Sequence, residues 1–181
     1  MVPACALVME LQTIVARRLD PADIAVVSVT ELFTDGIRNA LPGHARILGD
    51  CRSFRPEVSA RIEDEMRRIA AGIATTHGLE VSVRYDREFV PLTNDPALSE
   101  AMLAASAEVS EATQTRTAPM TASEDFARFL DHVPGCFGLI GNGENSAPLH
   151  APGYDFNDAA LMHGVSVHTA IARARLPVAQ G

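Results

Sequence analysis

One histidine, His150, lies in a short turn near the end of the chain, between Pro148 and Pro152. A metal ligand must be held in a fixed orientation, and the two prolines restrict the backbone on both sides of the ring. Imidazole binds zinc well, and nearby carboxylates can orient it. The spacing alone favours a simpler interpretation, a histidine on an exposed loop, so both interpretations stay open on this pattern.

Two carboxylates, Glu124 and Asp125, form a second candidate site in the stretch Thr121–Phe126. They could bind a substrate amine or support a metal ligand. However, Thr121 and Glu124 have the spacing of a capping box, and acidic residues are favoured at a helix start by its dipole. The residues alone therefore favour a helix cap.

Asn39 and Arg52 are the remaining polar candidates, within the stretches 38–42 and 49–54. An arginine on a strand can bind a carboxylate through two parallel hydrogen bonds, and an asparagine in a turn can donate to an oxyanion. The alternatives are a solvated strand arginine and an ordinary turn asparagine, and the local pattern prefers these alternatives.

Helices and strands must position these residues, and the spacing of apolar side chains along the first half of the chain switches between the helical and the strand period. The pattern predicts a helix over 3–18, strands over 24–32 and 45–54, a helix over 56–77 that Gly78 ends, and a strand over 79–89. One further strand in front would complete a split βαβ sandwich, and it would be a central strand of the sheet. We therefore expect the chain to begin partway through a domain.

The second half begins after a turn-rich segment, residues 91–96, which is a plausible domain boundary. Beyond it the sequence predicts helices over 96–111, 123–132 and 158–174, and a buried strand over 136–141. A loop rich in glycine and proline, residues 142–157, holds His150.

Composition excludes several classes of function. A formal net charge of −8 argues against a broad basic face for nucleic acid. The apolar start is interrupted by Glu10 and lacks a basic region in front, so it predicts neither a signal peptide nor a membrane span. The three cysteines, Cys5, Cys51 and Cys136, are odd in number and far apart. They predict buried free thiols in a reducing cytoplasm.

Several motifs together resemble those of the zinc-dependent N-acyl-amino-acid amidohydrolases, the family of hippurate hydrolase, auxin-conjugate hydrolases and carboxypeptidase G. The resemblance covers nearly the whole chain. Its motifs are Val26–Val29, Arg38–Pro42, Arg52–Phe54, Asn94–Pro96, Ser123–Phe126 and Pro148–Asp158.

The resemblance implies an α/β metallohydrolase whose catalytic domain is split by an inserted α+β lid that also forms a homodimer. Residues 1–92 would be a lid, or dimerisation domain, of split-βαβ type without its first strand, and residues 93–181 the C-terminal part of the catalytic domain. The family hydrolyses N-acyl amino acids with two divalent metals, zinc or manganese. His150 would be a metal ligand, Arg52 would bind the substrate carboxylate, Asn39 would act at the carbonyl, and Glu124 would line the site.

The other metal ligands and the catalytic glutamate of the family lie in an amino-terminal half that has no counterpart in this sequence. We therefore expect no catalytic residue on this chain, no stable metal binding by the chain alone, and no activity without a supplied amino-terminal half. The alternative is a non-catalytic dimerisation module or a degenerate remnant of the family.

Overall fold

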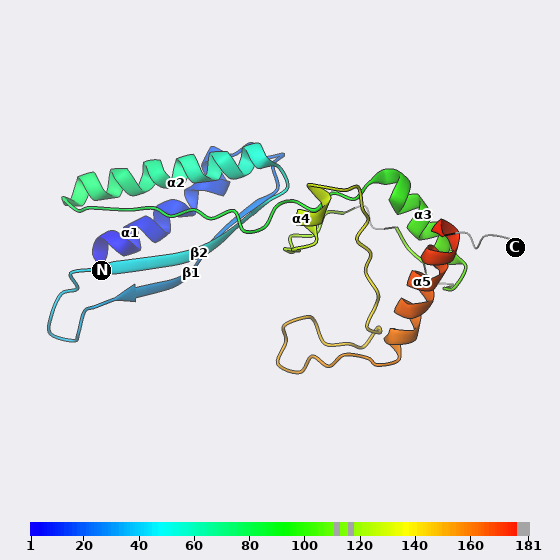
Figure 1. The fold of residues 1–181 in the computed structure, drawn as a ribbon. Helices are drawn as coiled ribbons and strands as arrows, with labels where there is room; N and C mark the ends of the chain where they lie inside the picture. Colours follow the sequence, from blue (N-terminus) through cyan, green and yellow to red (C-terminus); the bar gives the residue numbers. More distant parts are fainter. Residues whose placement is uncertain (111–112, 116–117, 177–181) are drawn as a thin grey trace, which may run out of the picture. The chain divides into compact units, whose positions relative to one another are not determined.

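The computed structural model describes residues 1–110, 113–115 and 118–176 (Figure 1). These residues form two compact units. The first unit consists of Met1–Pro91 together with Thr121–Ser123, and the second contains the other described residues from Leu92 onward. Helices and an antiparallel strand pair make up the regular structure, which agrees with a mixed α and β class.

An antiparallel hairpin is the sheet of the first unit. Strand β1, Ala25–Thr34, pairs with β2, Ala45–Ser53, and the register runs from Ala25 opposite Ser53 to Thr34 opposite Ala45. A bulge between Val29 and Glu31 interrupts the ladder near Gly49. A Cβ atom at Gly49 would lie 2.3 Å from the Ser28 carbonyl oxygen, so the close approach of the two strands requires glycine there.

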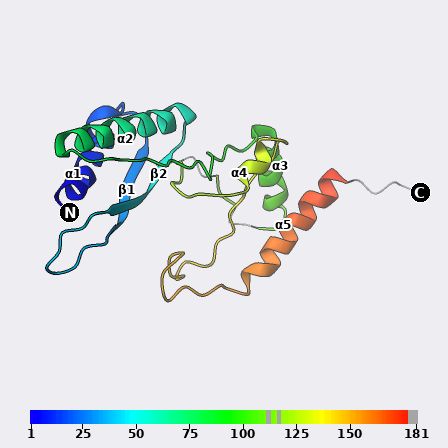
Figure 2. The ribbon, with the colours of Figure 1, turned by 60° about the vertical axis from the view of Figure 1, so that its left-hand side comes forward.

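Helix α2, Pro56–His77, covers one face of the hairpin (Figures 1 and 2). It has the predicted bounds, because Pro56 suits a first helical turn and Gly78 adopts the left-handed conformation that ends it. Its apolar stripe packs with residues of α1, the following turn and β1. The buried core consists of Leu11, Ile14, Val27, Val58, Ile62 and Ile69.

The predicted first helix is divided, and a single helix over 3–18 is wrong. Helix α1 spans Val2–Leu11, and a π-helical turn, η1, spans Ile14–Arg18. Thr13 lies at the junction, where its hydroxyl donates to the Glu10 carbonyl at 2.7 Å and accepts from Arg18 Nε at 3.1 Å. These side-chain bonds favour a break in the regular α-helical pattern, while Ile14 stays fully buried.

The strand predicted over 79–89 is not formed. In both ribbon views this segment runs back along α2, but no described strand pairs with it. Its backbone is bonded to a side chain instead, because Arg67 Nη1 donates to the Val83 carbonyl at 2.8 Å. Tyr85 still packs against the core. The apolar alternation predicted a half-buried strand, but Leu79, Val81 and Phe89 are exposed, and a strand also needs a neighbouring backbone.

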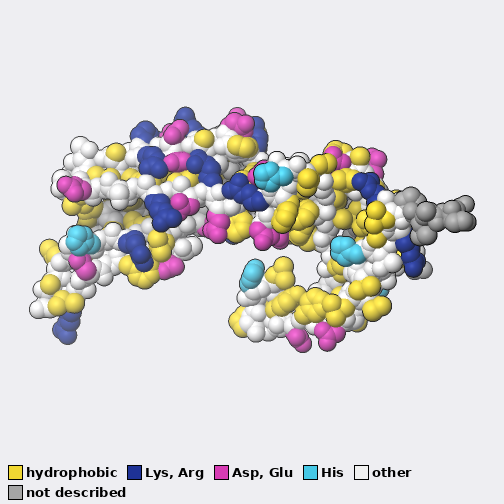
Figure 3. Space-filling view, viewed as in Figure 1, with side chains coloured by type: hydrophobic (Ala, Val, Ile, Leu, Met, Phe, Trp, Pro, Cys, Tyr) yellow, Lys and Arg dark blue, Asp and Glu magenta, His cyan; other side chains and the backbone are white. Residues whose placement is uncertain are grey.

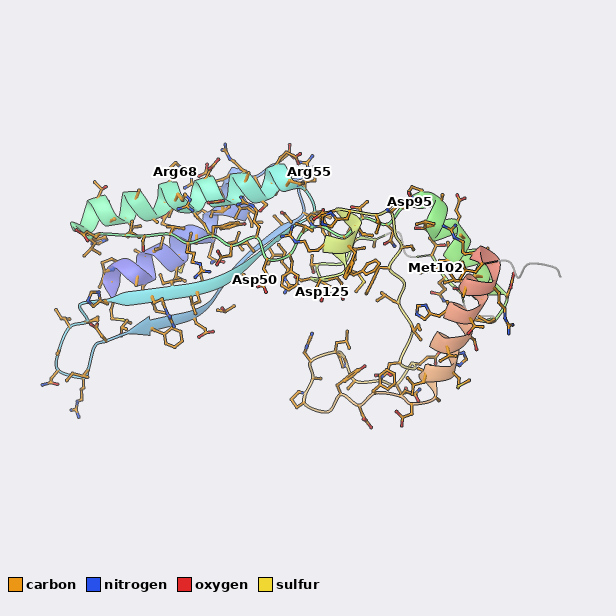
Figure 4. The ribbon with its side chains drawn as sticks, in the orientation of Figure 1. Asp50, Arg55, Arg68, Asp95, Met102 and Asp125 are labelled. Carbon is orange, nitrogen blue, oxygen red and sulfur yellow. The ribbon has the colours of Figure 1, made fainter. Side chains whose placement is uncertain are left out.

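The described residues of the second unit form the helices α3, Pro96–Ala107; α4, Ala127–Leu130; and α5, Ala160–Arg175. Figure 4 shows Asp95 at the start of α3, where its carboxylate accepts from the Leu98 amide at 2.9 Å. Helix α3 packs against α5. The predicted helix over 123–132 is much shorter in the structure, and the predicted end of α3 at residue 111 lies outside the described residues.

The strand predicted over 136–141 is also absent as a ladder. Asn94 supplies the missing partner, because its Oδ1 accepts from the Phe137 amide and its Nδ2 donates to the Phe137 carbonyl, both at 2.9 Å. The Asp95 amide also donates to the Gly135 carbonyl at 2.9 Å. One amide side chain therefore takes the hydrogen-bonding place of a neighbouring strand.

The second unit exposes many apolar side chains (Figure 3). Large side chains that are at least half exposed include Leu139, Ile140, Leu149, Phe156, Leu161, Met162 and Val165. Their clustering around α5 and the preceding loop is typical of a face that packs against further protein. Among the described residues, no helix has both the length and the apolar character to cross a membrane.

Candidate functional site

Arg52 lies on β2, opposite Val26, with a partly exposed side chain. Its Nε donates to the Asp50 carboxylate at 2.6 Å, and its Nη1 donates to the Thr121 carbonyl. Asp50 and Arg52 are two positions apart on one strand and therefore point to the same face. The two contacts fix the direction of the guanidinium.

Asn39 is exposed in the loop of residues 35–44 that joins β1 to β2. The base of this loop is held by Asp35, whose Oδ1 accepts from the His44 amide at 2.9 Å. That hydrogen bond is the main reason why the pKa of Asp35 lies below its ordinary value. An isolated bridge between Ile37 and Ala40 shapes the tip.

The structure does not bring Asn39 and Arg52 together. The loop joins the strands beside Thr34 and Ala45, whereas Arg52 lies near the other end of β2. The seven residue steps from Ala45 to Arg52, at about 3.3 Å each, put roughly 23 Å between the loop end of β2 and Arg52. One small substrate cannot touch both side chains of the same chain.

Glu124 lies three residues before the start of α4 and is partly buried. The predicted capping box is wrong: α4 begins at Ala127, and Phe126 at the N-cap position makes no side-chain capping bond. Instead, the Glu124 carbonyl accepts from the Ala127 amide at 3.4 Å, and Phe126 packs on Phe129 and Phe137. The start of this helix therefore carries aromatic packing and no side-chain cap.

His150 is exposed and has a φ of 68°, in the left-handed region. It is the only non-glycine residue with positive φ in the described part of the chain. This conformation costs on the order of 1 kcal/mol or more for a residue with a Cβ, and it persists where the surroundings hold it. His150 is the third residue of a turn closed by the Ala151 amide, which donates to the Pro148 carbonyl at 3.1 Å, and a second turn follows, in which the Tyr154 amide donates to the Ala151 carbonyl at 2.9 Å.

Asn142 is a residue of this loop that the sequence reasoning missed. Its side chain bonds to Ser146, to the Asp155 carbonyl and to the Asn157 amide. The only signal in the sequence is a pair of asparagines, Asn142 and Asn157, at the two ends of the glycine- and proline-rich segment.

Within residues 1–110, 113–115 and 118–176, no group of three or more His, Cys, Asp or Glu side chains could hold a metal. Protein zinc sites use about three or four protein ligands. The residues described here therefore do not make a metal site by themselves, and His150 is a single candidate ligand.

Cys51 is not an activated nucleophile. Burial, together with the neighbouring Asp50 carboxylate, raises the pKa of its thiol to about 11. Its ring neighbour Tyr85 also has a raised pKa, mainly through burial. The three cysteines are free, as predicted, but none is fully buried: Cys5 is exposed, and Cys51 and Cys136 are partly buried.

The sequence profile of peptidase family M20/M25/M40 matches residues 8–174. An N-acetyldiaminopimelate deacetylase of Limosilactobacillus fermentum is 31% identical over 175 residues, which cover 96% of this chain and 45% of the relative. Thermostable carboxypeptidase 2 of Saccharolobus solfataricus is 28% identical over 164 residues, which cover 88% of this chain and 41% of that protein. The chain thus spans less than half the length of these relatives.

Solved structures have the same fold as this chain. A candidate aminohydrolase from methicillin-resistant Staphylococcus aureus superposes with a TM-score of 0.73 at 27% identity, over 94% of this chain and 45% of the other. The YXEP protein of Bacillus subtilis, described as a dinuclear metal-binding peptidase, gives a TM-score of 0.76 at 24% identity. That alignment covers 97% of this chain and 45% of the Bacillus protein.

Proposed function

Because this chain belongs to peptidase family M20/M25/M40, we propose that it supplies the lid and the C-terminal catalytic part of a metal-dependent amidohydrolase. The proposed reaction is hydrolysis of the amide bond of an N-acyl amino acid. The observation that carries the proposal is the family match over residues 8–174, which includes Asn39, Arg52, Glu124 and His150.

His150 is the proposed metal contact of this chain, and the remaining ligands must come from other residues. A divalent metal, zinc or manganese, would polarise the carbonyl and lower the pKa of a bound water toward about 7. Left-handed backbone at His150 supports this role, because strain of this kind is concentrated at functional sites.

Arg52 is the proposed group for the substrate carboxylate. An arginine can form paired hydrogen bonds to a carboxylate, and Asp50 together with the Thr121 carbonyl holds its guanidinium in one orientation. Asn39 would act at the scissile carbonyl and Glu124 at the wall of the site. Because the hairpin separates Asn39 from Arg52 within one chain, the Asn39 and the Arg52 of a single site must come from two copies of the chain.

A homodimer through the first unit is therefore part of the proposal. In the described part of the chain the sheet has two strands and thus two open edges, and such edges pair readily with another chain. Across a dimer, Asn39 of one copy can approach a site to which the other copy contributes Arg52. The same edges support the competing assignment, a dimerisation module without catalysis.

Two substrates represent the proposed class. N-acetyldiaminopimelate is the compound named for several relatives, and hippurate represents the hippurate-like substrates that the family resemblance implies. The exposed apolar face around α5 supports the view that activity requires an amino-terminal half packed against this chain.

A chimera tests the proposal. The chain replaces the matching region of the Limosilactobacillus fermentum deacetylase, and hydrolysis of both substrates is measured with zinc or manganese. We expect metal-dependent hydrolysis by the chimera and none by the 181-residue chain alone. A folded, dimeric chimera without hydrolysis would favour the dimerisation module, and rapid hydrolysis by the chain alone would contradict the division of the site.

A further inference from the structure

We propose that Asn142 is a positioning residue, which closes the base of the loop of residues 142–157 and thereby holds His150 in its left-handed conformation. The importance of this role rests on the proposed function, in which His150 contacts the metal. The structural part of the inference stands on hydrogen bonds of the second unit alone.

The amide of Asn142 uses its donors and its acceptor at three separate points of the loop. Nδ2 donates to Ser146 Oγ at 2.7 Å and to the Asp155 carbonyl at 2.8 Å. Oδ1 accepts from the Asn157 amide at 2.7 Å. The backbone carbonyl of Asn142 also accepts from Asn157 Nδ2 at 3.3 Å. Asn142 and Asn157 thus form a clamp across the two ends of the loop.

The other backbone bonds within this loop are local turns, and they do not join its ends. The Ser146 amide bonds to Gly143 at 3.2 Å, the Ala151 amide to Pro148, and the Tyr154 amide to Ala151. Each spans three residues, so each shapes one turn and leaves the distance between the loop ends unrestrained. The clamp supplies that restraint.

The loop contains two residues in the left-handed region, Gly143 with a φ of 108° and His150 with a φ of 68°. Glycine adopts this conformation without strain, whereas histidine does so at a cost. Without the clamp, we expect the loop to widen and the Pro148–Ala151 turn, which contains His150, to relax to negative φ at His150. Asn142 therefore acts on His150 through the backbone and without touching it.

Asn94 offers a matched control in the same unit. It also forms an asparagine clamp, with two hydrogen bonds of 2.9 Å to Phe137, but it lies outside the loop of residues 142–157. Asn142→Ala and Asn94→Ala each remove one amide clamp from the second unit. A general loss of stability would affect both variants alike, whereas a positioning role singles out Asn142.

Nuclear magnetic resonance of the 181-residue chain tests the inference. Positive φ at His150 gives a strong intraresidue contact between its amide proton and Hα. We expect Asn142→Ala to lose this signature and to speed amide exchange at Asn157 by roughly tenfold or more, the effect of losing about 1.4 kcal/mol of local protection. Asn94→Ala should retain both. Retention of both by Asn142→Ala, or equal loss in Asn94→Ala, overturns the inference.

Two further variants keep the test decisive. Asn157→Ala removes the other side of the clamp and should give the same loss, which covers the case in which Asn142→Ala does not fold.

In Asn142→Asp the ionised carboxylate cannot donate, whereas the protonated form regains one donor. The His150 signature of this variant should return as the pH falls through the pKa of that carboxyl, and a flat pH profile counts against the donor contacts. These measurements involve no catalysis. An inactive chimera would therefore contradict the proposed function without contradicting the proposed role of Asn142 in the loop.

Discussion

Arg52 and Asp50 project from the same face of β2, and the guanidinium Nε donates to the carboxylate at 2.6 Å. Figure 4 marks Asp50 on this strand. A second contact, from Nη1 to the Thr121 carbonyl, ties Arg52 to a segment 69 residues away in the chain. The arginine is therefore oriented before any ligand arrives, which is the condition for paired recognition of a carboxylate.

Arg52→Ala in an active chimera should mainly harm substrates with a free carboxylate. Loss of a hydrogen bond to a charged group costs about 1.5–3 kcal/mol, or roughly ten- to a hundredfold in kcat/KM. The primary amide of the same substrate should lose much less, and Asp50→Asn, which keeps an acceptor beside Arg52, should lose less on either compound. Equal losses on the acid and the amide would make Arg52 a structural residue.

Gly49→Ala should destabilise the first unit, because the new Cβ would lie 2.3 Å from the Ser28 carbonyl and would push the strands apart. Overpacking of this kind costs typically about 1–3 kcal/mol. Gly72→Ala is the matched control, since nothing lies within 4 Å of its Cβ position in α2. That change should stabilise the helix by up to about 1 kcal/mol. Chemical denaturation measures both, and a neutral Gly49→Ala would disprove the tight strand contact.

Glu65 makes the stability of the first unit depend on pH. It is buried and bonds to Arg68 at 2.6 Å, to Arg61 at 3.1 Å and to Arg18 at 3.7 Å, and Figure 4 marks Arg68 on α2. The bond from Arg68 is the main cause of its lowered pKa. Its contribution is therefore complete above the unfolded pKa of about 4.3 and is lost as the pH falls through the lower folded value.

Glu65→Gln should accordingly lower the denaturation midpoint at neutral pH and flatten its fall in acid. Glu80→Gln, at an exposed position, should leave the curve of the parent chain unchanged. Thermal melts between pH 7 and pH 3 compare the three proteins, and superimposable curves for Glu65→Gln and the parent would show that the arginine cluster contributes nothing.

The 181-residue chain alone should bind zinc or manganese weakly and without a two-metal stoichiometry, because His150 is its one proposed ligand. Isothermal calorimetry measures this binding, and His150→Ala serves as the control for nonspecific sites. Two tight metals per chain would refute the proposed division of ligands.

The sequence was sufficient for elements whose signals are local. Helix α2 follows from its apolar stripe, Pro56 and Gly78, strand β1 from its valines and threonines, and the start of β2 from the Pro42–Gly43 turn before it. The segments 79–89 and 136–141 have apolar side chains of the kind found in strands, but hydrogen-bonding partners decide strands, and those partners are side chains of Arg67 and Asn94 here. Partners distant in sequence cannot be read from the segment itself.

In the candidate site, too, the sequence shows the residue types but not which residues lie close together. The residue types of Arg52 and His150 allow carboxylate and metal binding, but the length of the hairpin separates Asn39 from Arg52, and only the structure makes that separation visible. Asn142 was missed because an asparagine in a loop is an ordinary turn residue until its partners are known. The residue type of His150 likewise does not predict its left-handed backbone conformation.

The most direct test of the account is the metal content of the chimera with and without His150. The parent chimera, purified with zinc, and the variants His150→Ala and His163→Ala are compared by elemental analysis and by hydrolysis of N-acetyldiaminopimelate. His163 is an exposed histidine on α5 and provides the matched control. We predict that His150→Ala loses bound zinc and hydrolysis together while His163→Ala keeps both. Full zinc content and full activity in His150→Ala would contradict the central claim.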